Sequence, residues 1–127
     1  MIVRELYELN MKTNKIILQK LSFKDEDNYV LAERYYSLLS ALNNLKLTQR
    51  EVQLIAFTAV RGNMSYANVK EEFCKKYESS SPTISNIVSK LKRMGILIKD
   101  GGKIKLTPVI QLNFNLDVKL EINLTHG

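Results

Sequence analysis

Apolar residues recur at helical spacing in the segment 24–46. The intervals are 4, 3, 4 and 3 residues in the stripe formed by Leu31, Tyr35, Leu38, Leu42 and Leu45. Such spacing is typical of a coiled-coil seam. The preceding run KDEDN supplies capping side chains and negative charge for the positive end of a helix. We therefore predict a helix whose apolar face either packs on the rest of its own domain or pairs with a second copy of the chain.

Two further helices are predicted after this segment. Thr48 and Glu51 stand three residues apart and match a capping box, in which each side chain satisfies the other residue's backbone amide. The helix that follows, at about 49–61, is apolar most of the way round, so we expect neighbours to surround it. Ser65 is expected to cap the next helix, which runs to Tyr77. Its apolar stripe consists of Tyr66, Val69, Phe73 and Tyr77.

The stretch SSSPTISNIVSKLKRMG predicts a helix over 82–94. Ser81 is placed to cap it, Pro82 suits the first helical position, and Gly95 suits the left-handed residue that ends a helix. The stretches ILIK, DGG and KIKL then predict a two-stranded hairpin over 96–107. The apolar face of the helix consists of Ile84, Ile87, Val88, Leu91 and Met94.

Both ends of the chain have patterns that fit strands. The first 23 residues fit two short strands around the polar turn KTNK, and they also fit an irregular helix. In QLNFNLDVKLEINL apolar and polar residues alternate without interruption, which predicts a long, half-buried strand. Its partner would be the N-terminal strands, its own subunit's sheet or the same strand of another copy, because a long uncovered edge invites pairing.

Length and composition indicate one globular unit. The chain has 127 residues, of which 45% are hydrophobic and 25% are charged, close to the averages for globular domains. We expect an α+β protein with three parts. These are an N-terminal extension with a helix at 1–46, a central domain at 47–108 and a C-terminal strand at 109–127.

Several classes of function are disfavoured. No apolar run approaches the roughly 20 residues that span a bilayer, and the start MIVRELYELN does not fit a signal peptide, so we expect a cytoplasmic protein. Cys74 and His126 are the single cysteine and histidine, so we expect no disulfide, no metal and no other cofactor. No glycine-rich phosphate loop is present, and Asp25, Glu26 and Asp27 are explained as helix-capping residues, so we expect no enzyme.

The positive charge is concentrated in one part of the chain. The net charge is +6. Between Arg61 and Lys105, ten Lys or Arg residues stand against four acids, a local balance that also amounts to +6. A basic balance on one contiguous segment indicates a polyanionic partner.

The predicted order of elements resembles a known fold. Three helices followed by a basic hairpin are the layout of a winged helix-turn-helix domain, and residues 46–108 resemble the DNA-binding core of winged-helix regulators, especially the MarR-like group. The third helix of that group typically reads PTxSxxVxxLxxxGLI. The resemblance implies a double-stranded DNA-binding protein that regulates transcription. MarR-like proteins end in helices that form their dimer, whereas this chain is predicted to end in a strand. The matching residues are Pro82, Thr83, Ser85, Val88, Leu91, Gly95, Ile96 and Leu97.

The side chains of the segment suit DNA on physical grounds as well. A helix fits the major groove, where its amino-terminal residues reach base edges. The candidates for reading bases donate and accept hydrogen bonds: Ser81, Thr83, Ser85 and Asn86. Phosphate contacts, or minor-groove contacts at the hairpin, are expected from Lys70, Lys75, Lys76, Ser89, Lys90, Lys92, Arg93, Lys99, Lys103 and Lys105.

Two functions fit these features. The first is a transcriptional regulator that acts as a dimer on half-sites about one helical turn apart. The alternative is a structural or assembly factor, for example in replication, partition or phage DNA packaging, whose winged helix binds DNA weakly or binds a protein. Both imply a homodimer or higher oligomer. The candidate interface residues are Leu31, Tyr35, Leu38, Leu42, Leu112, Phe114, Leu116, Val118, Leu120 and Ile122.

Overall fold

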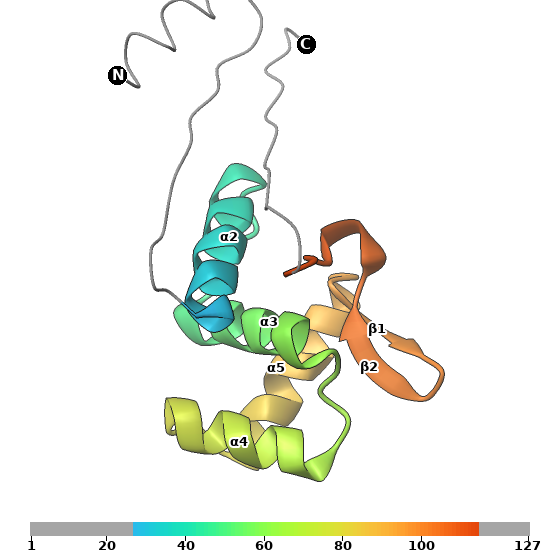
Figure 1. The fold of residues 1–127 in the computed structure, drawn as a ribbon. Coiled ribbons are helices and arrows are strands. Elements are labelled where there is room, and N and C mark those ends of the chain that lie inside the picture. Colours follow the sequence, from blue (N-terminus) through green and yellow to red (C-terminus); the bar gives the residue numbers. More distant parts are fainter. Residues whose placement is uncertain (1–26, 115–127) are drawn as a thin grey trace, which may run out of the picture.

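The computed structural model describes residues 27–114. This part of the chain is α+β, with four α-helices and one two-stranded antiparallel sheet, and its layout is compatible with a winged helix. Helix α3 crosses the centre, with α2 on one side of it and α4 on the other (Figure 1). The predicted strands in 1–23 lie outside the described residues. The elements are α2 (Asn28–Leu42), α3 (Gln49–Arg61), α4 (Ala67–Tyr77), α5 (Ser81–Arg93), β1 (Leu97–Asp100), β2 (Lys103–Leu106) and the 3-10 turn η1 (Pro108–Ile110).

Helix α2 packs on α3 through a face next to the predicted stripe. Asp27 caps the helix by accepting a hydrogen bond from the Val30 amide at 2.9 Å. The buried residues of α2 are Ala32, Tyr36 and Ser40. Two of these side chains are small, so α2 and α3 can approach each other closely. The stripe lies at the border of this contact. Tyr35 and Leu45 are half-buried, whereas Leu38 and Leu42 are 42% and 48% exposed.

Helix α3 is the core helix that the sequence predicted. Both bonds of the capping box form, since the Thr48 hydroxyl accepts from the Glu51 amide and the Glu51 carboxylate accepts from the Thr48 amide. Gly62 ends the helix in the left-handed conformation. Phe57 stacks edge-on against Phe73 of α4, with ring centroids 5.5 Å apart. Eight residues of α3 are buried, namely Glu51, Val52, Leu54, Ile55, Ala56, Phe57, Thr58 and Ala59.

The start of α4 corrects the predicted role of Ser65. The helix begins at Ala67, and Tyr66 occupies the N-cap position without a side-chain hydrogen bond. The Ser65 hydroxyl instead accepts from the Ile104 amide at 2.6 Å, and the Met64 amide donates to the Ile104 carbonyl at 3.0 Å. The outer edge of β2 needs these partners, so Ser65 serves the hairpin rather than the helix.

Helix α5 follows α4 after a three-residue turn at 78–80 and begins one residue earlier than predicted. Ser80, not Ser81, is the N-cap, and Pro82 occupies the second helical position. The predicted end is confirmed, because Gly95 adopts a φ of +76°. Its amide donates to the Lys92 carbonyl, and the Ile96 amide reaches back to the Leu91 carbonyl. These two bonds form a Schellman motif.

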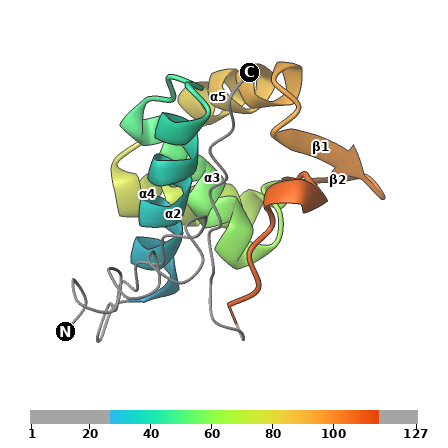
Figure 2. The same cartoon turned by 90° about the horizontal axis from the view of Figure 1, so that it is seen from above.

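The predicted hairpin forms with its turn at the two glycines. Leu97 pairs with Leu106 and Asp100 with Lys103. Gly101 and Gly102 both have positive φ, at 59° and 78°, as a two-residue turn that matches the strand twist requires. Figure 2 shows α5 and the hairpin following one another along one side of the molecule.

The predicted C-terminal strand does not begin where the sequence placed it. Residues 108–110 form the turn η1, and residues 111–114 have no strand conformation. The Tyr36 hydroxyl donates to the Ile110 carbonyl at 2.7 Å, which fixes this turn against α2. Leu112 and Phe114 are half-buried against the core. These two residues therefore pack on their own subunit and do not form part of an alternating strand. The rest of the predicted strand, including the candidate interface residues Leu116, Val118, Leu120 and Ile122, lies outside the described residues.

Candidate nucleic-acid interface

One face of α5 is buried and the rest of its surface is open. Ile84, Ile87, Val88 and Leu91 pack into the core, whereas Met94, which was predicted for the same face, is exposed. All four candidate base-reading residues are exposed, and so are the candidate phosphate contacts Ser89, Lys92 and Arg93. The amphipathic pattern therefore predicted the orientation of α5 correctly, with its polar face outward.

The exposed side chains of α5 differ in how far they are already engaged. The hydroxyl groups of Thr83 and Ser80 are 2.9 Å apart, so Thr83 is part of the helix cap. Within residues 27–114, no hydrogen bond or ion pair engages the side chains of Ser85, Asn86 and Lys92. The polar groups of these three side chains face solvent and are accessible to an external partner.

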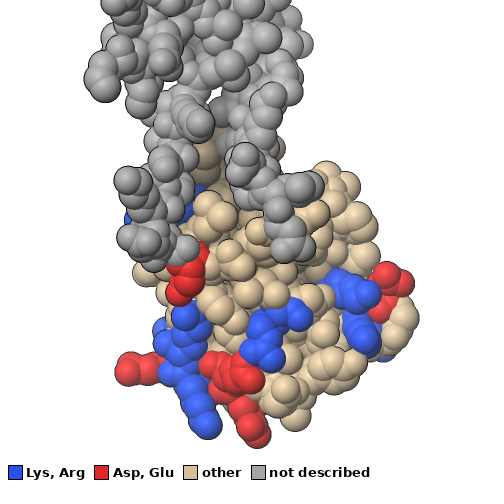
Figure 3. Space-filling view, in the orientation of Figure 1, with Lys and Arg blue, Asp and Glu red and all other residues tan. Residues whose placement is uncertain are grey.

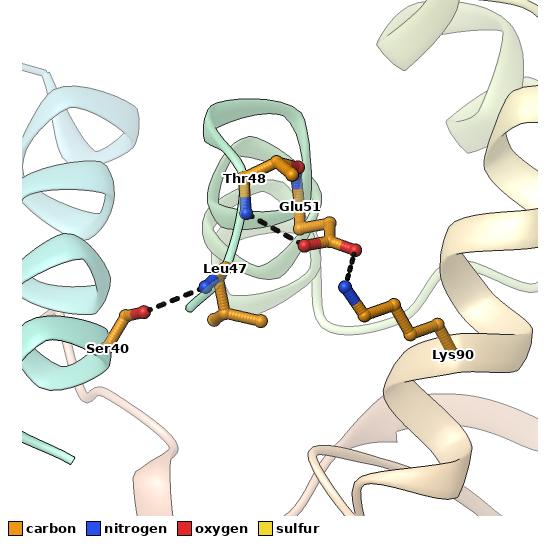
Figure 4. Close-up of polar contacts among 5 residues, drawn as sticks. All are labelled: Ser40, Leu47, Thr48, Glu51 and Lys90. Carbon is orange, nitrogen blue, oxygen red and sulfur yellow. Dashed lines mark hydrogen bonds and ion pairs between the residues drawn. The ribbon is translucent and has the colours of Figure 1, made fainter. Parts of the chain in front are cut away.

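Lys90 is held by a carboxylate of α3. Its ammonium lies 2.7 Å from Glu51 Oε2, and the other carboxylate oxygen accepts from the Thr48 amide at 2.8 Å (Figure 4). Glu51 is only 5% exposed. Burial alone raises the pKa of Glu51, but the hydrogen bonds from Lys90 and Thr48 outweigh it and hold the pKa below its ordinary value. The sequence placed Lys90 among the phosphate contacts, and the structure gives it a partner inside the protein.

The three lysines of α4 point in two directions. Lys70 and Lys75 line a shallow groove of about 430 Å³ beside the amino terminus of α5, together with Cys74 and Ser81. The ammonium of Lys76 lies instead 4.5 Å from the centre of the Tyr29 ring on α2. Lys70 and Lys75 are therefore near the open face of α5, and Lys76 is packed on the aromatic side of the molecule.

The basic residues of the hairpin lie around its tip. Lys99 is exposed. Lys105 is 4.0 Å from Asp100, a loose and exposed ion pair of small energetic value. The ammonium of Lys103 lies 5.5 Å from the centre of the Tyr66 ring, which is 49% exposed. The sequence did not single out Tyr66, because helical spacing placed it in an apolar stripe.

The face seen in Figure 1 carries both signs of charge. In the same orientation, Figure 3 shows basic side chains next to acidic ones. Arg61 and Glu72 form one ion pair in this part of the chain. Because α5 lies behind α3 in this view, its polar face belongs to another side of the molecule.

A second surface feature is an apolar groove between α2 and the base of the hairpin. Its lining has no charged residue, and Val109, which is part of the lining, is 89% exposed. Leu38 and Leu42 lie on the neighbouring surface of α2. The lining residues are Tyr35, Leu39, Asn43, Leu45, Gly95, Ile96, Thr107, Val109 and Ile110.

The described residues include neither a metal-binding cluster nor a membrane-spanning helix. Between residues 27 and 114, no three side chains of the metal-ligating types His, Cys, Asp and Glu gather at one place. None of the helices in this range combines the length and the hydrophobicity needed to cross a bilayer. Cys74 is a free, half-buried thiol.

Comparisons with protein-family models, with curated proteins and with solved structures found no match for this chain.

Proposed function

We propose that residues 47–108 form a winged helix-turn-helix domain that binds double-stranded DNA and that the protein regulates transcription. In this proposal α5 enters the major groove, and the β1–β2 hairpin is the wing. The observation that carries it is the open polar face of α5, where Ser85, Asn86 and Lys92 have no partner among the described residues. A helix with such side chains near its amino terminus fits the major groove and reaches base edges.

Asn86 is the main candidate for direct base recognition. Its exposed amide both donates and accepts hydrogen bonds, so it can form two bonds to an adenine. The hydroxyl groups of Ser81 and Ser85 can form hydrogen bonds with several different bases, so these residues discriminate less between DNA sequences. Thr83 is partly occupied by the cap of α5.

The distribution of cations supports binding to the phosphate backbone. Lys70 and Lys75 beside the amino terminus of α5, Lys92 and Arg93 near its end, and Lys99 on the hairpin surround the open face. Contacts from about five such cations give a slope of about −4.5 for log K against log salt concentration.

An assembly factor is the second candidate, and the apolar groove beside α2 favours it. Exposed apolar surface is typical of sites that bind another protein or another copy. In this case DNA binding would be weak and independent of sequence, and the oligomer would carry the function.

Selection of bound fragments from a pool of random duplexes, followed by sequencing, tests both candidates. A regulator enriches one sequence, with two related half-sites about one helical turn apart. An assembly factor binds duplexes without enrichment. Absence of binding to any duplex at low salt contradicts the proposed function.

A further inference from the structure

The first turn of α3 contacts both helices that flank the turn 78–80. The Arg50 guanidinium donates to the carbonyl of Tyr77, the last residue of α4. The next residue, Glu51, holds the ammonium of Lys90 on α5. Two consecutive residues of the core helix thus hold α4 and α5 from the same end of α3.

We propose that Arg50 and Glu51 act as a clamp that sets the orientation of α5 relative to α4. Lys90 is then a positioning residue that acts through Glu51, and it is not a phosphate contact. This inference rests on the proposed function, since it concerns how α5 is presented to DNA.

The geometry of the carboxylate explains why the clamp is specific. Both oxygens of Glu51 are used, Oε1 by the Thr48 amide and Oε2 by Lys90, within the contact that Figure 4 shows between α3 and α5. Because Glu51 is only 5% exposed, removing the ammonium of Lys90 leaves a buried carboxylate without its ion-pair partner, which is unfavourable. The carboxylate therefore draws α5 into one position.

The side chain of Lys90 supports the same conclusion. It stands at the border between the exposed and the buried face of α5, half-buried, with its charged end turned toward α3. Lys92 is two positions further on, exposed and without an ion pair among the described residues. The two lysines are a matched pair, one expected to position the helix and the other to contact phosphate.

Salt dependence separates these two roles. Affinity for a fluorescein-labelled duplex of random sequence is measured by anisotropy between about 50 and 200 mM KCl. Lys92→Met should reduce the size of the salt slope by about 0.9, the value of one phosphate contact. Lys90→Met should leave the salt slope unchanged, because Lys90 makes no phosphate contact in this proposal. It should lower the affinity by about threefold to thirtyfold at every salt concentration, because Lys90 acts on DNA binding through its neighbours.

Two rescue variants test whether Lys90 acts through Glu51. Lys90→Arg keeps a donor for the carboxylate and should restore most of the affinity. The double variant Glu51→Gln with Lys90→Met leaves no buried charge and keeps an acceptor for the Thr48 amide, so it should also bind better than Lys90→Met alone. Arg50→Gln should lower the affinity without changing the slope, because it loosens the other half of the clamp.

All affinities are measured at a temperature at which circular dichroism shows each variant to be fully folded. A variant that is only less stable then has the same affinity for the duplex as the wild type. A slope reduced by Lys90→Met as much as by Lys92→Met, with no rescue by the double variant, overturns the inference. If the wild-type protein binds no duplex, the proposed function fails, and the clamp is judged by thermal unfolding. The effects of Glu51→Gln and Lys90→Met on unfolding should then be non-additive, and additive effects reject the clamp.

Discussion

At the scale of single residues, similar side chains have different roles because their surroundings differ. Ser65 and Ser80 both precede a helix, yet Ser80 caps α5 and Ser65 binds the hairpin. Lys90 and Lys92 lie on one helix, yet only Lys90 meets a buried carboxylate. Contacts from residues distant in sequence decide each case.

The acid stability of the protein should depend on Glu51. Because its pKa is lowered in the folded state, the unfolded chain binds more protons, and stability falls as the pH drops. The contribution is complete above the ordinary pKa of 4.5 and is lost as the pH falls through the folded value. Urea unfolding between neutral and acidic pH should therefore show a smaller acid loss in Glu51→Gln. An equal acid loss in both proteins would contradict the lowered pKa.

Gly95 should be required for its backbone conformation alone. A Cβ at this position would meet no atom within 4 Å, but the φ of +76° is strained for other residues. Gly95→Ala should lower the free energy of unfolding by about 1–2 kcal/mol, measured by urea unfolding. Gly95→Asn is the control and should lose less, since asparagine tolerates this region better. Equal losses for both variants would point to another cause.

At the scale of elements, the hairpin is attached to the helices through a segment that has no regular structure. The Met64 amide donates to the Ile104 carbonyl, and the Ser65 hydroxyl accepts from the Ile104 amide, so this segment covers part of the outer edge of β2. This attachment holds the hairpin close to the start of α4.

Ser65→Ala should therefore loosen the hairpin and not the helix. It removes the acceptor of the Ile104 amide, at a cost of about 1 kcal/mol. Amide hydrogen exchange should become faster at Ile104 and stay unchanged in the first turn of α4. Ser80→Ala is the matched control, which should speed up exchange at the start of α5. Faster exchange in α4 after Ser65→Ala would restore the role that the sequence suggested.

The elements whose signals are local were predicted well. The capping box at Thr48, the glycine after α5 and the DGG turn each act within a few residues, and all three form as expected. Three other features were missed because they depend on packing between distant segments. Ser65 binds the hairpin, the buried face of α2 is set by its fit to α3, and the chain after Ile110 follows the core rather than an extended path. The N-cap of α5 was missed by one residue within a run of three serines.

The candidate site could be predicted only in part for the same reason. Helical periodicity was enough to show that Ser85, Asn86, Lys92 and Arg93 face outward, and they do. No pattern in the sequence joins Glu51 to Lys90, because 39 positions separate them and the contact exists only after α3 and α5 pack.

At the scale of the whole molecule, two surfaces of different chemistry lie on the described chain. The polar face of α5 suits a polyanion, and the groove beside α2 is apolar. In the proposed regulator, the apolar surface would join two copies, so that two α5 helices reach successive half-sites.

Replacing Leu38 and Leu42 together with glutamate tests this assembly. If α2 joins two copies, light scattering after size exclusion should give twice the subunit mass of 14.6 kDa for the wild type and a single subunit mass for the variant. Thermal stability of the subunit should stay nearly unchanged, because both residues are exposed. Ser37→Glu, at an exposed position of α2 outside the stripe of Leu38 and Leu42, is the control. Equal masses for wild type and variant would exclude α2 as the interface.

The most direct test of the central claim is a titration of the isotope-labelled protein with duplex DNA, followed by NMR. The claim is that the open face of α5 and the hairpin lie against the duplex. We expect the largest shift changes in Ser81–Arg93 and Lys99–Lys103, with little change at Leu38 and Leu42. Shifts confined to α2 and the apolar groove, or no shifts at any duplex concentration at low salt, would contradict it.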